Sequence, residues 1–224
     1  MSNVFSASIG KKLIMSISGL FLVIFLLVHL TVNSLLLAGD GKLFNLAAHF
    51  MAANPVIKII EPLLAIGFII HIIYASTLTL LNRKARPVKY KVVDQSDSST
   101  WSSRNMYILG ATIFIFLVLH IINFYWKLKF GEVAFVDYGK GEIHDTYSLV
   151  TGLFINCWWY DLIYIAGAIF LGLHLTHAFW SAFQTLGWSN DLWRKRLDVI
   201  GIVYSYIIAI GFSIIPLYFL ISGQ

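Results

Sequence analysis

Long uninterrupted apolar runs, separated by short polar segments, dominate the pattern along the chain. Five of these runs reach the roughly 20 residues that a helix needs to cross a lipid bilayer. Their apolar residues follow one another without the alternation of a β-barrel strand, so each run predicts a transmembrane helix. The sequence therefore predicts an all-α integral membrane bundle of five helices, in one domain over residues 1–224, with spans at about 13–37, 57–81, 107–125, 162–184 and 199–220.

Composition agrees with a membrane protein and excludes several other classes. The 224 residues are 58% hydrophobic and 12% charged, with a mean hydropathy of +0.78, which is too apolar for a soluble domain of this length. The single cysteine, Cys157, excludes an internal disulfide and supplies too few thiolates for an iron-sulfur cluster or a structural zinc site. Any such cluster would have to belong to a partner protein.

Basic residues predict the orientation in the membrane. The net charge is +5, but the Lys and Arg residues lie beside apolar runs, where they act as topology signals and do not indicate a nucleic-acid partner. Eleven of the sixteen precede the first run, lie between the second and third, or lie between the fourth and fifth. The positive-inside rule then places the N-terminus in the cytoplasm and the C-terminus outside, in a multi-pass protein of a bacterial cytoplasmic membrane.

Four of the apolar runs contain a histidine at a depth that recurs in pairs. His29 and His120 each lie 16 residues from the more basic end of their segment, counted from Leu13 (after Lys11 and Lys12) and from Arg104, or roughly 24 Å along a helix. His71 and His174 lie about 10 to 12 residues from the ends of their runs, roughly 15 to 18 Å. An imidazole inside a membrane is costly unless something binds it. Two pairs at two depths predict axial ligation of two b haems stacked across the membrane.

Neighbouring residues fit haem binding between helices. Small residues flank two of the histidines one turn away, at Gly67, Ala75 and Ala178, and would leave room for a porphyrin plane. Asn33 and Asn123 project beside the outer histidines and are candidates for a propionate or a quinone contact.

The remaining histidines have other interpretations. His177 faces nearly the same side of its helix as His174 but lies roughly 4.5 Å nearer the cytoplasm, which suits a propionate contact at the inner rim better than ligation. His49 and His144 are expected in loops, as exposed or interfacial residues, and His49 is also a quinone candidate by position.

Two other functions compete with this interpretation. The haem b subunit of a hydrogenase or a formate dehydrogenase would place two ligands on one helix, as His174 and His177 would allow. A transporter would use histidines and carboxylates near the midplane as a substrate path, but Glu61 is the only acid well inside the expected spans.

Around these histidines the chain resembles the di-haem cytochrome b membrane anchor of succinate:quinone oxidoreductases, the succinate dehydrogenases and quinol:fumarate reductases, in the type whose anchor is one polypeptide. The likeness covers nearly the whole chain. The matching stretches are SGLFLVIFLLVHLTVN around His29, LFNLAAHFM around His49, EPLLAIGFIIHIIYA around His71, LVLHIINF around His120 and GLHLTHAFWSAFQTLG around His174.

The resemblance implies that His29 and His120 hold a distal haem, and that His71 and His174 hold a proximal one. It also implies a flavoprotein and an iron-sulfur protein docked on the cytoplasmic face, with electrons exchanged through the haems with a quinone, commonly menaquinone. A dimer of such complexes is compatible with it. Some fumarate reductases of this type have a glutamate two residues before the fourth ligand, where this chain has Gly172, so a proton path through that carboxylate is not expected here.

Overall fold

The computed structural model describes residues 8–85, 100–139, 141–188 and 190–222. Five helical segments in it are long and apolar enough to cross a membrane, which confirms the expected all-α membrane bundle. Most of them extend beyond the apolar runs. They are α1 (Ser8–Ser34) with the 3-10 turn η1 (Leu35–Ala38), α3 (Pro55–Lys84), α5 (Met106–His120) continued by the π-helix η2 (Ile121–Trp126) and α6 (Lys127–Phe130), α8 (Trp158–Thr185), and α9 (Asp191–Ser222).

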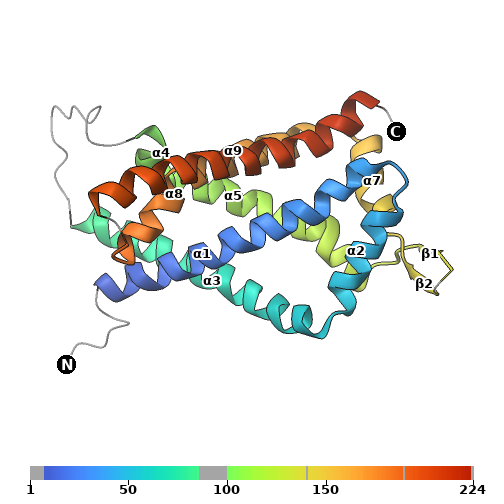
Figure 1. Ribbon diagram of the computed structural model, residues 1–224, viewed down its shortest axis with the longest axis horizontal. Helices are drawn as coiled ribbons and strands as arrows, with labels where there is room; N and C mark the ends of the chain where they lie inside the picture. Colours follow the sequence, from blue (N-terminus) through green and yellow to red (C-terminus); the bar gives the residue numbers. More distant parts are fainter. Residues whose placement is uncertain (1–7, 86–99, 140, 189, 223–224) are drawn as a thin grey trace.

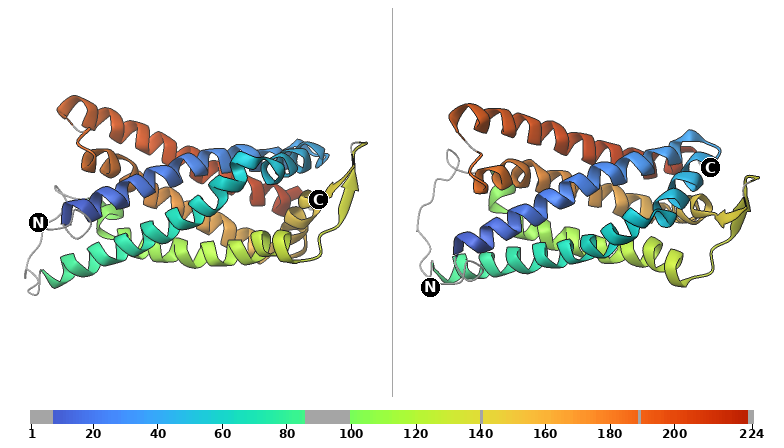
Figure 2. Two further views of the ribbon diagram at one scale, coloured as in Figure 1. Left: turned by 90° about the horizontal axis from the view of Figure 1, so that it is seen from below. Right: turned by 60° about the horizontal axis from the view of Figure 1, so that its bottom comes forward.

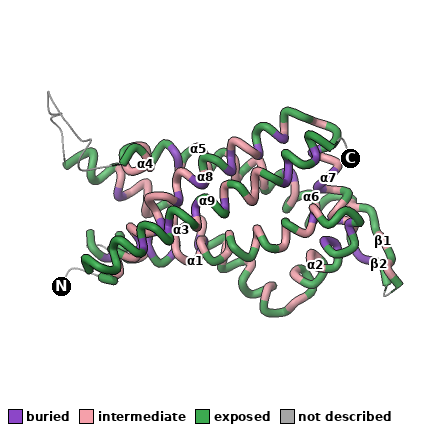
Figure 3. The backbone as a smooth tube through the Cα atoms, turned by 45° about the horizontal axis from the view of Figure 1, so that its top comes forward, coloured by how far each residue is buried: buried purple, intermediate pink, exposed green. Residues whose placement is uncertain are grey.

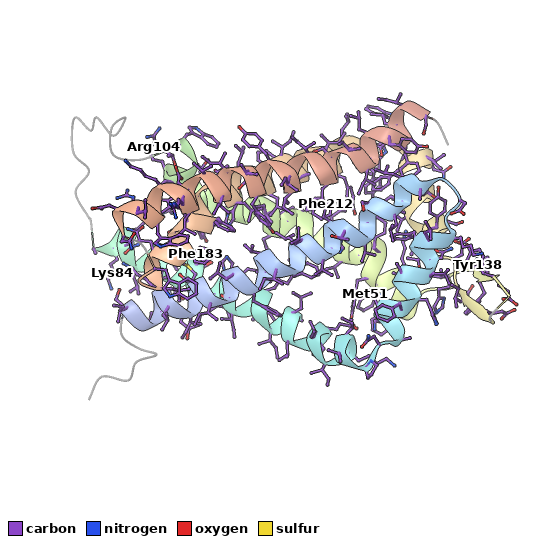
Figure 4. All side chains as sticks on the ribbon, viewed as in Figure 1. Met51, Lys84, Arg104, Tyr138, Phe183 and Phe212 are labelled. Carbon is purple, nitrogen blue, oxygen red and sulfur yellow. The ribbon has the colours of Figure 1, made fainter. Side chains whose placement is uncertain are left out.

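The long helices run side by side along the length of the molecule, with the two chain ends at opposite ends of the bundle (Figure 1). At one end lie the start of α1, the end of α3, the short helix α4 (Trp101–Arg104), the end of α8 and the start of α9. Lys84 and Arg104 are both at this end, which we call the basic end (Figure 4). Residues on the outside of the bundle are mostly exposed (Figure 3), and many of them are large and apolar, as lipid contact requires.

The opposite end is covered by short elements, and we call it the capped end. Its cover is made of α2 (Lys42–Ala53), the antiparallel pair β1 (Phe135–Asp137) and β2 (Glu142–His144), and α7 (Thr146–Asn156). The hairpin extends past the ends of the long helices (Figure 2). None of these elements belongs to the five expected spans.

A network around Asn45 holds the cover together. The side chain of Asn45 is buried and donates to the Tyr138 hydroxyl at 3.1 Å and to Asp145 Oδ1 at 2.9 Å. Its own oxygen accepts from the backbone amide of Tyr147 at 2.7 Å. Asp145 also caps α7 by accepting from the backbone amide of Ser148. One amide side chain therefore joins α2, the hairpin region and α7.

Close helix packing is made possible by small residues, above all between α8 and α9. A methyl group at Gly172 would lie 2.6 Å from Cβ of Ala209, and one at Gly201 would lie 3.0 Å from the Phe179 ring. Gly67 has the same role between α3 and α1, because a methyl group there would meet the ring of Phe21 at 3.1 Å. Gly67 thus makes room for Phe21, and the expectation that it opens space for a porphyrin is not supported.

Candidate functional site

The imidazoles of His29 and His120 face each other across the bundle. His29 belongs to α1 and His120 is the last residue of α5, and their ring centres lie 5.7 Å apart with the ring planes at 86°. With metal–nitrogen bonds of about 2 Å, two imidazoles on opposite sides of one ion have centres roughly 6 Å apart. The observed spacing matches that requirement. We call these two residues the outer pair.

The second pair, His71 of α3 and His174 of α8, lies deeper toward the basic end, and we call it the inner pair. The two side chains are near enough to interact electrostatically. Each ring sits opposite a glycine of another helix: a methyl group at Gly19 of α1 would lie 3.2 Å from Cε1 of His71, and one at Gly110 of α5 would lie 3.5 Å from Cε1 of His174. The inner pair is therefore enclosed by four helices, α1, α3, α5 and α8.

The glycines also relate the two levels to each other. Gly19 precedes His29 by ten positions on α1, and Gly110 precedes His120 by ten positions on α5, an axial rise of roughly 15 Å in each case. Two helices thus repeat the same arrangement, with a glycine at the inner level and a histidine at the outer level.

Hydrogen bonds leave one nitrogen of His71 free to bind a metal. Its Nδ1 lies 3.3 Å from the carbonyl oxygen of Met15 and 3.5 Å from Oγ of Ser18. Because a carbonyl oxygen can only accept, the proton of a neutral ring is on Nδ1, and Nε2 keeps the lone pair that a metal ion binds. A backbone carbonyl that orients a ligand in this way is the usual outer-shell partner of metal-bound histidine.

Two other histidines bring unsatisfied nitrogens into the bundle. Nδ1 of His120 and Nδ1 of His174 are buried without a hydrogen-bond partner in the part of the chain that the structure describes. Buried polar atoms are nearly always paired, so such exceptions point to a bound group or to water.

The paired histidines suit a cofactor that supplies further ligands to its own metal ion. Among the described residues, no three or more His, Cys, Asp or Glu side chains gather where they could hold a bare metal ion. Two imidazoles alone leave most coordination positions of an iron ion open, and a porphyrin supplies four nitrogens to fill them. The paired histidines and the facing glycines fit haem.

The asparagines beside the outer pair are already engaged by the protein. Asn33 donates to the carbonyl oxygen of His29 at 2.8 Å, and its amide nitrogen lies 3.3 Å from Nδ1 of the same residue. Asn123 is buried in the π-helix that follows His120 and donates to the Tyr164 hydroxyl at 3.3 Å. Single π-turns are frequent at functional sites. Both side chains help to position the outer level, and their contact with a propionate or a quinone stays a prediction.

The other three histidines belong to neither pair. His177 packs edge-on against Trp180, with the ring centres 5.4 Å apart, one turn nearer the basic end than His174. His49 is exposed on α2, so its placement in a loop was wrong. His144 is in β2, where it stacks on Phe135 at 4.6 Å, so the loop placement was wrong for this residue too.

One acid was missed because α8 begins earlier than its apolar run. The expected fourth span started at residue 162, but α8 starts at Trp158 and so includes Asp161. Asp161 is fully buried, and neither carboxyl oxygen has a hydrogen-bond partner among the described residues. Glu61, the acid foreseen from the sequence, is instead partly exposed, accepting from the Tyr125 hydroxyl at 2.6 Å and pairing with Lys129 at 3.0 Å.

Comparisons with known protein families, with characterised proteins and with solved structures find no match to this chain.

Proposed function

We propose that this chain is the di-haem cytochrome b membrane anchor of a succinate dehydrogenase or fumarate reductase complex, passing electrons between an iron-sulfur subunit and a quinone. The observation that supports this most directly is the outer pair, whose ring centres lie 5.7 Å apart although the two residues belong to different helices. The inner pair supports it independently, because it joins two further helices at a second level.

The chain's own residues would hold, orient and enclose the cofactors. His29 and His120 would bind one haem iron, and His71 and His174 the other. The Met15 carbonyl would fix the ring of His71, while Gly19 and Gly110 leave the inner imidazoles room. Haem bound at each level would supply a one-electron carrier. The exposed apolar surface would keep both carriers within the bilayer and away from bulk water.

The charge distribution supports one orientation for the complex. The basic end would face the bacterial cytoplasm, with the C-terminus outside. The flavoprotein and the iron-sulfur subunit would dock at the basic end, next to the inner pair. Electrons would then travel from the inner level to the outer level, or the reverse. A quinone, menaquinone in the commonest case, would react near the outer pair, where Asn33, His49 and Asn123 are candidate contacts.

The decisive experiment is to purify the full chain in detergent from a haem-sufficient host and to record its reduced-minus-oxidised spectrum. The expected result is two low-spin b haems per chain. Copurification with a flavoprotein and an iron-sulfur protein active on succinate or fumarate would then separate this function from that of a hydrogenase or formate dehydrogenase subunit. A colourless chain, or one that takes up a single haem when fully loaded, would refute the proposal.

A further inference from the structure

Asp161 is an unusual carboxyl group for a membrane helix. Its relative exposure is 0%, and both oxygens lack a hydrogen-bond partner in the described part of the chain. Burial makes the ionised form costly, so this carboxyl group holds its proton more tightly than a free one does. A neutral acid still has one donor and spare acceptor capacity, and leaving these unpaired is costly. The site therefore lacks a partner that can both accept and donate a hydrogen bond.

Stabilisation of the helix terminus does not account for Asp161. The residue lies in the first turn of α8, where a negative charge can interact favourably with the helix dipole. That role needs an ionised group, usually one that accepts from the free backbone amides. Neither oxygen of Asp161 accepts such a bond, and the N-cap position, Cys157, makes no side-chain capping bond.

The position of Asp161 relates it to the outer pair. Asp161 precedes Tyr164 by three residues and so lies on the same face of α8, roughly 4.5 Å nearer the capped end. The Tyr164 ring is 6.0 Å from that of His120, and its hydroxyl accepts from Asn123 of the π-helix. From the capped end inward, polar groups thus follow in the order Asp161, the Tyr164–Asn123 pair and the outer histidines.

We propose that Asp161 is the proton-exchanging carboxyl group of a quinone site at the capped end of the bundle, beside Tyr164. The inference rests on the proposed electron-transfer function, which supplies the electrons. A quinone has carbonyl oxygens that accept a hydrogen bond, and its reduced form has hydroxyl groups that donate one. These are the two bonds that the buried carboxyl group lacks.

The chemistry balances with protons from the aqueous phase. Reduction of a quinone to a quinol takes up two electrons and two protons. As the quinone oxygen gains electrons, the O–H bond of Asp161 breaks and an O–H bond forms on the quinone. The carboxylate regains a proton from the water at the capped end, and the other quinone oxygen takes the second proton from that water. Quinol oxidation is the same sequence reversed.

Quinone binding tests the inference without relying on turnover. The full chain, purified in detergent, is titrated with menadione, and its Kd is measured by calorimetry for the unmodified chain, Asp161→Leu, Asp161→Glu and Glu142→Gln. Loss of one well-made hydrogen bond should weaken binding about tenfold in Asp161→Leu, which has neither donor nor acceptor. Asp161→Glu keeps a carboxyl group and should stay within about threefold. Glu142→Gln neutralises an exposed acid at the same end and should bind as the unmodified chain does.

Infrared spectroscopy follows the proton itself. The unmodified chain should show the carbonyl band of a protonated carboxyl group that shifts when menadione binds and disappears in Asp161→Asn. Unchanged menadione affinity in Asp161→Leu would overturn the inference. If that variant does not fold, a carboxyl band that menadione leaves unshifted in the unmodified chain would overturn it equally. Haem content, measured on the same samples, tests the proposed function separately, because none of these outcomes depends on it.

Discussion

Gly19 of α1 and His71 of α3 are in direct contact: a methyl group on the glycine would lie 3.2 Å from Cε1 of the imidazole and 3.5 Å from its Nδ1. Gly110 of α5 has the same relationship to His174 of α8. His71 is therefore accommodated by the missing side chain of Gly19, whereas at Gly110 a methyl group would be in ordinary contact with His174 and only a larger side chain would displace it. The inner level depends on these two glycines as well as on its two imidazoles.

Replacing either glycine by leucine should abolish the inner haem and spare the outer one. The leucine side chain would occupy the space of the imidazole and force it out of position, while the outer level lies roughly 15 Å away. The haem content of Gly19→Leu and of Gly110→Leu should fall by about half, with one set of b-type bands lost from the difference spectrum. Gly152→Leu in α7 is the matched control, because a methyl group there meets only Asn156, at 3.8 Å. Loss of both haems in the two inner variants, or of neither, would contradict this arrangement.

Single alanine substitutions of the four histidines should sort into two classes. His29→Ala and His120→Ala should lose the same outer haem, since each removes one of two axial ligands, and His71→Ala and His174→Ala should lose the inner one. Redox titration of each purified variant, with two midpoint potentials expected for the unmodified chain, identifies which carrier is missing.

His177→Ala provides the control for this series and separates two families of cytochrome. His177 contacts Trp180 and lies one turn from the inner pair, so its removal should leave both haems in place and at most shift the inner potential. Loss of a haem in His177→Ala would instead indicate two ligands on one helix, as in hydrogenase-type subunits.

Counting along the sequence sufficed to pair His29 with His120 because the rise per residue of a helix is fixed. Equal distances from basic flanks translate into equal depth, and the structure brings those two rings together. The facing glycines could not be found in the same way. Nothing in the sequence tells which side of α1 faces α3, so Gly19 does not stand out until the helices are packed.

Gly172 should tolerate no side chain unless α9 changes with it. Its position against Ala209 and the Ser205 carbonyl means that Gly172→Ala overpacks the α8–α9 contact, at a cost of about 1–3 kcal/mol. Thermal unfolding in detergent should show a lower midpoint for Gly172→Ala and a larger drop for Gly172→Glu. The exchanged pair Gly172→Ala with Ala209→Gly should recover most of the loss, because the two positions are coupled. If the effects of the two single substitutions on the unfolding midpoint simply added in the exchanged pair, the contact between Gly172 and Ala209 would not be what limits the side chain at position 172.

The capped end should loosen in acid. Burial raises the pKa of Asp145, but hydrogen bonds from Ser148 and Asn45 outweigh burial and hold that pKa below its ordinary value of 3.8. A group with a lowered folded pKa stabilises the protein above its unfolded pKa, and this contribution is lost as the pH falls through the folded value. Hydrogen exchange in α7, corrected for the intrinsic rate, should therefore accelerate as the pH falls from about 5 to about 3. Asp145→Asn should exchange faster at all these pH values and lose the acid dependence.

The cover of the capped end could be predicted from the sequence only in part. α2 follows Gly41, whose φ of +66° turns the chain, and its apolar positions Leu43, Leu46 and Phe50 have helical spacing that could have revealed it. The role of Asn45 could not be predicted, because its partners come from distant segments. Asp161 was not predicted as a residue of the fourth span because the expected span began at residue 162. The helix α8 starts before this apolar run, at Trp158, and so includes Asp161.

The network of Asn45 also constrains the order in which the protein can be completed. Its partners Tyr138, Asp145 and Tyr147 follow it by 93, 100 and 102 residues. During synthesis the first three spans are therefore made before the cover of the capped end can form. The haem proposed for the outer pair, whose two histidines belong to these spans, would have that interval in which to enter.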